Sequence, residues 1–260
     1  MHSYREEKIK IKLIVSHFTQ NYEKIPIIND ISFYLKKNEF VTLIGPSGCG
    51  KSTIFNMIAG IVPIDKGRVI IDGKNQTGQL GQVSYMYQKD LLLPWQKIID
   101  NISLPLIIKG IRRQESRNQV RSYLDLFGLK GFEYKYPFQL SGGMRQRAAL
   151  LRTYMFSRDI ILLDEPFGGL DAITRAKMQI WLLHVIQKLK ASVLFITHDI
   201  EEAIYLSDRI YVLSPRPAVV KEEVKINLPR PREREIITSL QFNRIKAHIL
   251  KHLSEEGGII

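Results

Sequence analysis

The chain has a single cysteine, no long apolar run and no apolar segment at its start. Cys49 therefore has no intrachain disulfide partner, which agrees with a reducing compartment. No run approaches the roughly 18 apolar residues that span a membrane, and residues 1–8 lack the apolar core of a signal peptide. We therefore expect a cytosolic protein that reaches a membrane only through a partner.

The rest of the composition is that of a globular protein with excess positive charge. Of 260 residues, 45% are hydrophobic and 25% are charged, and the formal net charge is +12. Nucleic acid and anionic membrane surfaces both attract such a chain. The basic residues are spread out, and no basic patch is interleaved with aromatic residues. We therefore favour a solvated basic surface facing anionic lipid, and expect no nucleic-acid partner.

One glycine-rich segment organises the chain. It follows an apolar run, residues 40–44, that predicts a buried strand, and it precedes a helical pattern over residues 54–60. A strand, a turn containing G-x-x-x-x-G-K-S and a helix form the loop that binds the phosphates of a nucleoside triphosphate. The residues of this phosphate loop are, in order, Gly45, Pro46, Ser47, Gly48, Cys49, Gly50, Lys51, Ser52 and Thr53.

The residue types in the phosphate loop suit this chemistry. Its glycines allow backbone conformations that a Cβ would block, so that N–H groups converge on an anion. The N-terminus of the following helix adds partial positive charge. Lys51 can reach the β- and γ-phosphates, and the hydroxyl of Ser52 can bind Mg²⁺. Cys49 is best explained as a small residue at a variable position of the motif.

The remaining pattern predicts an α/β protein. Alternating strands and helices over residues 159–213 imply a parallel sheet with crossover helices. Residues 8–15, 27–35 and 68–71 read as strands of a small antiparallel region around the phosphate loop. Further strands are expected at 82–88, 160–163, 192–197 and 210–213, and helices at 112–127, 144–157 and 172–190.

The tail of the chain, residues 221–260, differs from the rest. A linker-like break at 228–232 precedes apolar residues at helical spacing. We interpret this pattern as a helix that packs back on the domain. The alternative is a helix that binds a partner.

Polar residues follow several of the predicted strands. Asp164 ends an apolar strand, where a carboxylate can bind Mg²⁺ or its waters. Because side chains alternate across a strand, Glu165 points elsewhere and can deprotonate an attacking water. Ligand groups collect at the carboxyl ends of strands in an open α/β sheet. His198 can thus contact the γ-phosphate or the water, and Gln88 can reach the metal or the water.

A second glycine-bearing helix start lies at residues 140–147, Leu-Ser-Gly-Gly-Met-Arg-Gln-Arg. Ser141 is a good N-cap residue, and the exposed N–H groups behind it make another anion site. The chain thus carries two helix N-termini suited to phosphate. Local chemistry leaves open whether both meet one nucleotide.

In this order, the segments resemble the ATP-binding subunit of an ABC transporter over about residues 8–220, and the segment at 140–147 is highly specific to that family. The resemblance implies a P-loop NTPase core with a mostly parallel sheet, an N-terminal antiparallel β subdomain and a helical signature subdomain. We assign residues 1–220 to the ATPase domain, with the helical subdomain at about 89–157, and 221–260 to the tail.

The resemblance also implies a homodimer that sandwiches two ATP molecules. Ser141, Gly142 and Gly143 of one chain would face the γ-phosphate held by Lys51 of the other, and Asp171 would lie at the dimer interface.

Further roles come from the same resemblance. Glu165 would be the catalytic base, Gln88 and His198 would complete the catalytic set, and an aromatic residue would stack on adenine. Tyr22 fits that position best, and Phe18 is the alternative.

A finer resemblance is to the nitrate, sulfonate and taurine importer group. It rests on the phosphate loop, Asn101 and residues 91–95, 166–172 and 213–217. Tyr87 and Gly169 depart from the usual phenylalanine and alanine. The chain ends without the regulatory domain of some nitrate importers, which favours sulfonates, taurine or pyrimidine vitamin precursors over nitrate.

We therefore predict an ATP-hydrolysing subunit, bound peripherally at the cytoplasmic face of the cell membrane, that powers an importer with ATP and Mg²⁺ as cofactors. Integral permease subunits would dock near residues 88–95, whose apolar part could instead be a loop turned into the domain. A separate solute-binding protein would complete the system. The alternatives are a non-transport ABC ATPase acting on nucleic acid or ribosomes, and a P-loop kinase, in which residues 140–147 would have no role.

Overall fold

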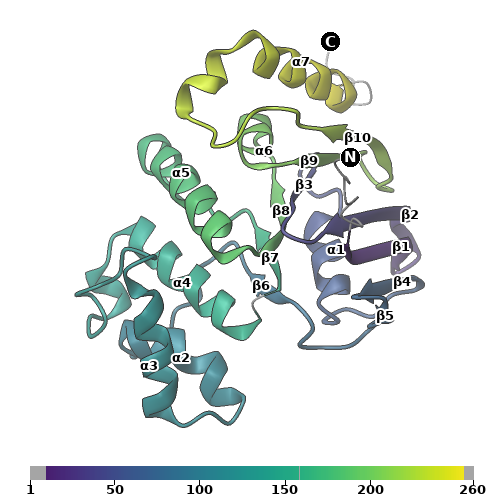
Figure 1. Ribbon diagram of the computed structural model, residues 1–260. Helices are drawn as coiled ribbons and strands as arrows, with labels where there is room; N and C mark the ends of the chain where they lie inside the picture. Colours follow the sequence, from purple (N-terminus) through teal and green to yellow (C-terminus); the bar gives the residue numbers. More distant parts are fainter. Residues whose placement is uncertain (1–9, 158, 255–260) are drawn as a thin grey trace, which may run out of the picture.

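A six-stranded sheet forms the centre of the computed structural model, which describes residues 10–157 and 159–254 (Figure 1). The strand order is β10-β9-β3-β8-β7-β6, and all neighbours pair in parallel except β10, which is antiparallel to β9. The strands are β3 (Phe40–Ile44), β6 (Ser84–Met86), β7 (Ile160–Asp164), β8 (Ser192–Thr197), β9 (Arg209–Leu213) and β10 (Val220–Lys225). The predicted parallel sheet is therefore present, although the strand expected at 82–88 is reduced to β6.

A second, antiparallel sheet has the order β2-β1-β4-β5. Its strands are β1 (Ile11–Tyr22), β2 (Ile25–Lys36), β4 (Lys66–Ile71) and β5 (Lys74–Asn75). β1 continues well beyond the predicted end at residue 15. Its register with β2 shifts between Val15 and Phe18, and His17 has φ = 54°. Such a bulge interrupts the alternation of side chains, so the sequence pattern stops before the strand does.

Helices cover both faces of the central sheet and extend beyond its β6 edge, where α2, α3 and α4 group together (Figure 1). None of the described helices is both long enough and apolar enough to span a bilayer. The α-helices are α1 (Lys51–Ile58), α2 (Ile98–Ile108), α3 (Arg113–Leu124), α4 (Gly142–Phe156), α5 (Ala172–Leu189), α6 (Ile200–Leu206) and α7 (Leu240–Ser254), with short 3₁₀ helices η1 (Pro137–Gln139) and η2 (Arg234–Thr238).

The sequence pattern missed α2. Its residues are apolar nearly all round, Ile-Ile-Asp-Asn-Ile-Ser-Leu-Pro-Leu-Ile-Ile, and include Pro105. A helix of this kind has little amphipathic periodicity, and proline argues against a helix interior. The predicted helices at 112–127, 144–157 and 172–190 correspond to α3, α4 and α5. α3 and α5 bury one face each, whereas α4 is buried nearly all round over residues 148–151.

The central strands β3, β7, β8 and β9 are buried throughout and mostly apolar because both sheet faces are covered. Along β7, Ile161 and Leu163 pack with the core that includes α4 and α5. Ile160 and Leu162 point the other way, into the core shared with α1 and the antiparallel sheet. A parallel strand buried on both faces reads as a continuous apolar run rather than as an alternation.

A buried ion pair ties the two sheets together. Arg209 in β9 donates from Nε to Glu39 Oε1 at 2.7 Å and from Nη2 to Glu39 Oε2 at 2.9 Å. Its guanidinium also donates to the backbone oxygen of Tyr34 at 2.8 Å and stacks on the Tyr34 ring. The side chains of Arg209 and Glu39 are only 3% and 9% exposed. Glu39 thus neutralises a cation that lies in the interior.

The segment 228–232 does not behave as a linker. Arg230 donates to Asp208 Oδ1 at 2.9 Å, and buried Arg232 donates to the backbone oxygens of Ile204 and Tyr205 at 3.0 and 2.8 Å. These long-range bonds hold the segment against the end of α6. α7 then buries Phe242 and Ile249 in the same core as the central sheet.

Candidate functional site

The strand order of the central sheet gathers the predicted site residues at one edge. β8 lies between β3 and β7, and the three strands run in the same direction. Their ends are level, since Ile44 pairs with Thr197 and Ile196 pairs with Asp164. The phosphate loop, the residues after β8 and those after β7 therefore emerge side by side, as ligand-binding groups do in open α/β sheets.

The phosphate loop needs its glycines. Gly48 and Gly50 have φ values of 75° and 113°, in the left-handed region that favours glycine. A Cβ on Gly45 would lie 3.0 Å from the Cβ of Leu213 and 3.1 Å from the Sγ of Cys49. Larger residues at these positions would push the loop away from β9 or change its path.

The helix after the loop starts earlier than predicted. α1 begins at Lys51 rather than at residue 54, so Lys51, Ser52 and Thr53 form its first turn. The N–H groups of a first helical turn have no partner within the helix and can bind an anion. Lys51 is buried, and its Nζ donates to the backbone oxygens of Gly45 and Pro46 at 2.8 and 2.9 Å. These bonds hold the ammonium group inside the curve of the loop.

The phosphate loop contains one buried thiol and receives one contact from a distant arginine. Burial raises the pKa of the Cys49 thiol, against the opposing effect of nearby Lys51, so the neutral thiol is a packing residue. Arg216, between β9 and β10, donates from Nε to the backbone oxygen of Gly48. Sequence reasoning did not assign a role to Arg216, because a contact between the loop and a residue so far along the chain leaves no local pattern.

Asp164 is a buried carboxylate beside the phosphate loop. Desolvation raises its pKa, while hydrogen bonds from Ser52 and from the Tyr85 hydroxyl, 3.2 Å away, lower it. Two oxygen groups of the predicted metal site, Ser52 and Asp164, are therefore in contact. Tyr85 was not predicted, and burial also raises its own pKa, so it remains a neutral hydrogen-bond donor.

Glu165, Gln88 and His198 converge on one carboxylate oxygen. Nε2 of Gln88 donates to Oε2 of Glu165 at 3.5 Å, and Nδ1 of His198 lies 3.2 Å from the same oxygen. Glu165 has φ = 43°, an uncommon conformation for a residue with a side chain. Its backbone N–H donates to Ile196 at 3.0 Å, which anchors this turn to β8. The three predicted catalytic residues thus form one cluster.

A small cavity adjoins this cluster. It has a volume of about 40 Å³ and is bordered by Glu165, Gly168, Thr197, His198 and Glu202 among others. This is room for at least one water molecule, since a cavity of about 10–15 Å³ already holds one. The carboxylate that is predicted to act as a base therefore lies beside a space of suitable size.

Glu202 is a supporting residue that sequence reasoning missed. It is buried, accepts a hydrogen bond from the Thr197 hydroxyl, and accepts another from Gln179 Nε2 at 3.0 Å. Burial raises its pKa. Asp199 caps α6 by accepting from the N–H of Glu202 at 3.0 Å. The sequence signal was Asp199 followed three positions later by Glu202, a typical helix start, and the pair fixes the segment that carries His198.

The second predicted anion site is a well-formed helix start. Ser141 caps α4, as its position predicts, by accepting a hydrogen bond from the N–H of Met144 at 3.3 Å. A Cβ on Gly143 would lie 3.4 Å from Thr174 Cγ2, and one on Gly142 would lie 3.4 Å from Leu170. Figure 1 shows α4 and α1 well apart, with β6 and β7 between them. Within one chain the two helix starts do not meet.

The other predicted contacts lie at the surface. Asp171 caps α5 by accepting from the N–H groups of Ile173 and Thr174 at 3.1 and 3.0 Å. A hydrogen bond from the Thr174 side chain, together with these N–H groups, lowers the pKa of Asp171. Tyr22, at the end of β1, has an exposed ring. The alternative adenine-stacking residue, Phe18, is fully buried and offers no face to a ligand.

Comparisons with known proteins identify the family. A family model described as ABC transporter matches residues 28–168. The chain belongs to the ABC transporter family. The P-loop NTPase fold and the ABC-type ATP-binding subunit that the sequence predicts are therefore confirmed.

Curated relatives match the family assignment over nearly the whole chain. An uncharacterized ABC transporter ATP-binding protein of Methanocaldococcus jannaschii is 41% identical over 97% of this chain and 95% of its own length. An aliphatic sulfonates import ATP-binding protein of Bacillus cereus is 38% identical, covering 97% and 98% of the two chains. A taurine import ATP-binding protein of Escherichia coli O157:H7 is 37% identical, covering 94% and 98%.

Solved structures give the same result. A bacterial ABC transporter cassette, described as dimeric, superposes with a TM-score of 0.70 and 30% identity, covering 84% of this chain and 100% of the other. The same cassette in a post-hydrolysis state with ADP and inorganic phosphate superposes with a TM-score of 0.69 and 29% identity. These relatives and structures are described as ABC transporter proteins, import ATP-binding proteins or ATP-binding cassettes, and none is described as an ATPase that acts on nucleic acid.

Proposed function

We propose that this chain hydrolyses ATP to drive the import of a sulfonate or of taurine. The observation that carries the proposal is the cluster of Glu165, Gln88 and His198 at the sheet edge that also bears the phosphate loop. The relatives named for aliphatic sulfonate and taurine import support the substrate class. Nitrate and pyrimidine vitamin precursors also fit the group that the sequence resembles, and an uptake assay distinguishes them.

The residues at the phosphate loop fit Mg²⁺ together with ATP. Mg²⁺ prefers oxygen ligands and usually keeps several waters when it binds beside phosphates. Ser52 and Asp164 supply a hydroxyl and a carboxylate in mutual contact, and Gln88 adds a nearby amide. When bound, the ion neutralises charge on the phosphate oxygens. Lys51 and the first turn of α1 would hold the phosphates themselves.

The chain's own residues account for the hydrolytic step. Glu165 accepts a proton from the water that attacks the γ-phosphate, with the cavity beside it as the place for that water. Gln88 and His198, both within 3.5 Å of the Glu165 carboxylate, orient the carboxylate and the water. Glu202 holds the turn that carries His198, so the donor stays in place.

Two copies of the chain would complete the site. Ser141 is exposed at the start of α4, and the N–H groups there suit a γ-phosphate held by the Lys51 of another copy. Asp171 would lie in the same interface. The dimeric cassette that superposes on this chain supports this arrangement. A lone chain would then bind ATP but hydrolyse it poorly.

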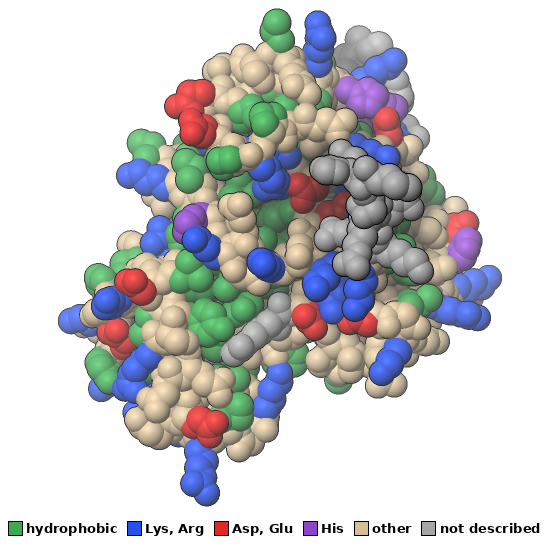
Figure 2. Space-filling view, in the orientation of Figure 1, with side chains coloured by type: hydrophobic (Ala, Val, Ile, Leu, Met, Phe, Trp, Pro, Cys, Tyr) green, Lys and Arg blue, Asp and Glu red, His purple; other side chains and the backbone are tan. Residues whose placement is uncertain are grey.

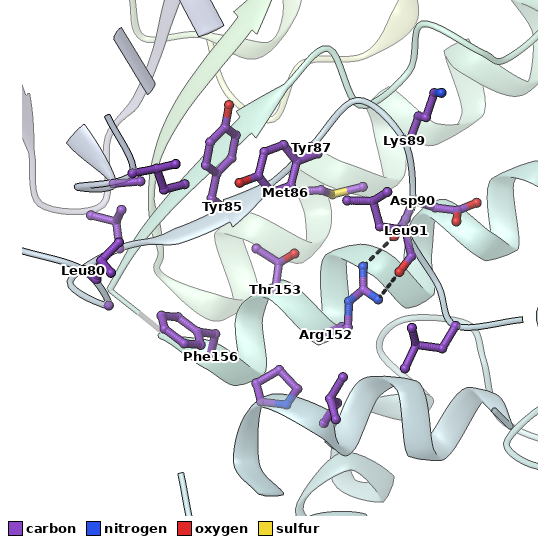
Figure 3. Close-up of a pocket in the computed structure, with 17 residues that line it drawn as sticks. Leu80, Tyr85, Met86, Tyr87, Lys89, Asp90, Leu91, Arg152, Thr153 and Phe156 are labelled. Atoms are coloured by element: carbon purple, nitrogen blue, oxygen red, sulfur yellow. Dashed lines mark hydrogen bonds between the residues drawn. The ribbon is translucent and has the colours of Figure 1, made fainter. Parts of the chain in front are cut away.

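An apolar pocket beside the predicted docking loop suits a permease subunit. The pocket has a volume of about 460 Å³ and lies between the loop after β6, α2 and the end of α4 (Figure 3). Figure 3 shows Phe156 and Thr153 facing Tyr85 and Met86 across it. Arg152 holds the loop by donating to the backbone oxygens of Asp90 and Leu91 at 2.5 and 2.7 Å.

The docking loop itself presents apolar side chains. Leu92 is buried, but Leu91 and Trp95 are 53% and 70% exposed. The loop is rigid, because Asn101 accepts from the N–H of Leu93 at 2.6 Å and donates to the oxygens of Leu93 and Gln96 at 3.1 and 3.0 Å. Exposed aromatic anchors beside a pocket are typical of interaction sites. We assign the pocket to a cytoplasmic helix of an integral membrane subunit, which would place the chain at the cytoplasmic face of the membrane.

Uptake by the assembled system tests the proposal. The chain is produced with candidate permease subunits and a solute-binding protein, and the complex is reconstituted into vesicles that enclose ATP and Mg²⁺, with the solute-binding protein and the solute outside. We expect ATP-dependent accumulation of taurine or an aliphatic sulfonate. ATP hydrolysis without accumulation of either would refute the substrate class. An absence of hydrolysis in the full complex would refute the enzymatic role.

A further inference from the structure

A cluster of two histidines and a glutamate lies where the tail meets the central sheet, remote in sequence from the phosphate loop. His248 and His252 are four positions apart in α7, so their side chains share one face of the helix. Glu222 faces them from β10, the edge strand. Figure 2 shows histidine side chains next to a carboxylate over the C-terminal part of α7.

The potential ligand atoms converge. Nε2 of His248 is 2.8 Å from Oε1 of Glu222, and Nε2 of His252 is 2.5 Å from Oε2 of the same carboxylate. All three ligand atoms lie within 4.8 Å of one another. A tetrahedral Zn²⁺ site with bonds of about 2.1 Å needs ligand atoms about 3.4 Å apart. Small side-chain rotations reach that geometry.

Ion pairing alone does not satisfy this cluster. Oε2 of Glu222 is shielded from solvent and has no hydrogen-bond partner among the described residues, despite the short distance to His252. The two imidazole rings lie with centroids 4.9 Å apart, so two protonated histidines would repel each other. A divalent cation between the three groups would bind the buried carboxylate oxygen of Glu222 and the unprotonated nitrogen of each neutral imidazole.

The supporting structure is rigid. Phe242 and Ile249 of α7 are fully buried. Lys246 pairs with Glu201 of α6 at 2.6 Å, and Lys221 donates to the backbone oxygen of His252 at 3.0 Å. The face that carries the histidines is therefore held toward β10 before any ion binds, which lowers the ordering cost of binding.

We propose that Glu222, His248 and His252 bind one Zn²⁺ ion, which clasps α7 to β10. Two imidazoles and a carboxylate suit zinc and related transition metals, whereas Mg²⁺ and Ca²⁺ prefer oxygen ligands. Three protein ligands leave a fourth position for water. The site is thus separate from the Mg²⁺ site at the phosphate loop in both position and chemistry.

Zinc titration tests the proposed metal site. Full-length protein without a histidine tag is stripped with a chelator and titrated with Zn²⁺ against a chromophoric zinc indicator, with excess Mg²⁺ present. We expect one Zn²⁺ per chain. The double variant His248→Ala/His252→Ala should bind zinc at least about 100-fold more weakly, since even residues that only support metal ligands cost 10–100-fold when changed.

A matched control uses an exposed histidine–carboxylate pair that lies away from the proposed metal ligands and from the phosphate loop. His17 lies 2.6 Å from Asp30 on the antiparallel sheet, with both side chains exposed, so His17→Ala should leave zinc binding unchanged. Glu222→Gln serves as a second variant if the double variant folds poorly. Co²⁺ should give the visible absorption of a four-coordinate site in the unchanged chain. Zinc binding that is equal in the double variant, or lost in His17→Ala, would overturn the proposal, as would a chain that retains no zinc against the indicator.

Discussion

Glu165→Gln is the most direct test of the proposed catalytic cluster. Glutamine has the size and shape of glutamate and can adopt the same backbone conformation, so the contacts around position 165 should be kept. The change removes the basic oxygen that lies 3.2 Å from His198 Nδ1 and 3.5 Å from Gln88 Nε2. Only the capacity to accept a proton is lost.

The expected loss of hydrolysis rate follows from the proposed role of Glu165 as a general base. A positioned general base contributes about 10²- to 10⁴-fold to a rate. At about 1.36 kcal/mol per factor of ten, this corresponds to about 2.7–5.4 kcal/mol of activation free energy. We therefore expect hydrolysis by Glu165→Gln to fall by at least about 100-fold. ATP binding should persist, because the phosphate loop and Asp164 are unchanged, and the dimer should accumulate because ATP is not consumed.

Three measurements check this expectation. Phosphate release reports turnover, a fluorescent ATP analogue reports binding, and gel filtration with ATP and Mg²⁺ reports dimerisation. Glu115→Gln, an exposed glutamate in α3, is the matched control and should behave as the unchanged chain. Near-normal turnover in Glu165→Gln would refute the assignment of the base. Loss of ATP binding would show that position 165 serves binding instead.

Three further predictions concern docking, stability and pH. Trp95→Ala removes a 70%-exposed ring and should weaken assembly with the permease by about 2 kcal/mol while leaving ATP binding intact. Glu39→Gln leaves the buried Arg209 with only the partly exposed Glu223, 3.2 Å away, as counter-charge and should cost about 3 kcal/mol of unfolding free energy in urea, the lower end for a broken buried pair. Burial raises the pKa of Asp164, so the folded state loses stability as pH rises above the ordinary value of 3.8. Asp164→Asn should therefore stabilise the nucleotide-free chain at pH 7 and not below pH 3.8, while it reduces hydrolysis.

Each of these predictions has a contrary outcome. Unchanged uptake in Trp95→Ala would refute the docking loop. A loss below about 1 kcal/mol in Glu39→Gln, the range of exposed pairs, would mean that Glu223 suffices as the counter-charge of Arg209. If Asp164→Asn melts at a lower temperature than the unchanged chain at pH 7, the ionised carboxylate stabilises the fold and the reasoning is refuted.

Local patterns predicted the parts of this protein that depend on neighbours in the chain. The phosphate loop, the N-cap at Ser141 and the apolar strand before Asp164 involve residues a few positions apart. Their residue types follow from backbone conformation and from hydrogen bonds within one turn. The same locality explains the errors: α2 lacks periodicity, and the bulge near His17 hides the continuation of β1.

Other features need contacts between distant segments. Arg216 meets the phosphate loop, Arg209 meets Glu39, and Arg232 anchors a segment that reads as a linker. In the tail, Glu222 and His248 are brought together only when α7 lies against β10. The spacing of residues in the sequence does not predict such pairs, because which residues meet depends on how whole helices and strands pack.

The sequence by itself determined the family, the nucleotide chemistry and the residue types available at the ends of the strands. Only the tertiary structure decided which of these ends are neighbours. β8 lies between β3 and β7, and this places His198 against Glu165 rather than elsewhere along the sheet edge. The physical reason is that these strands are all mostly apolar and nearly equivalent as local patterns, so their order is set by burial and by connections over the whole chain.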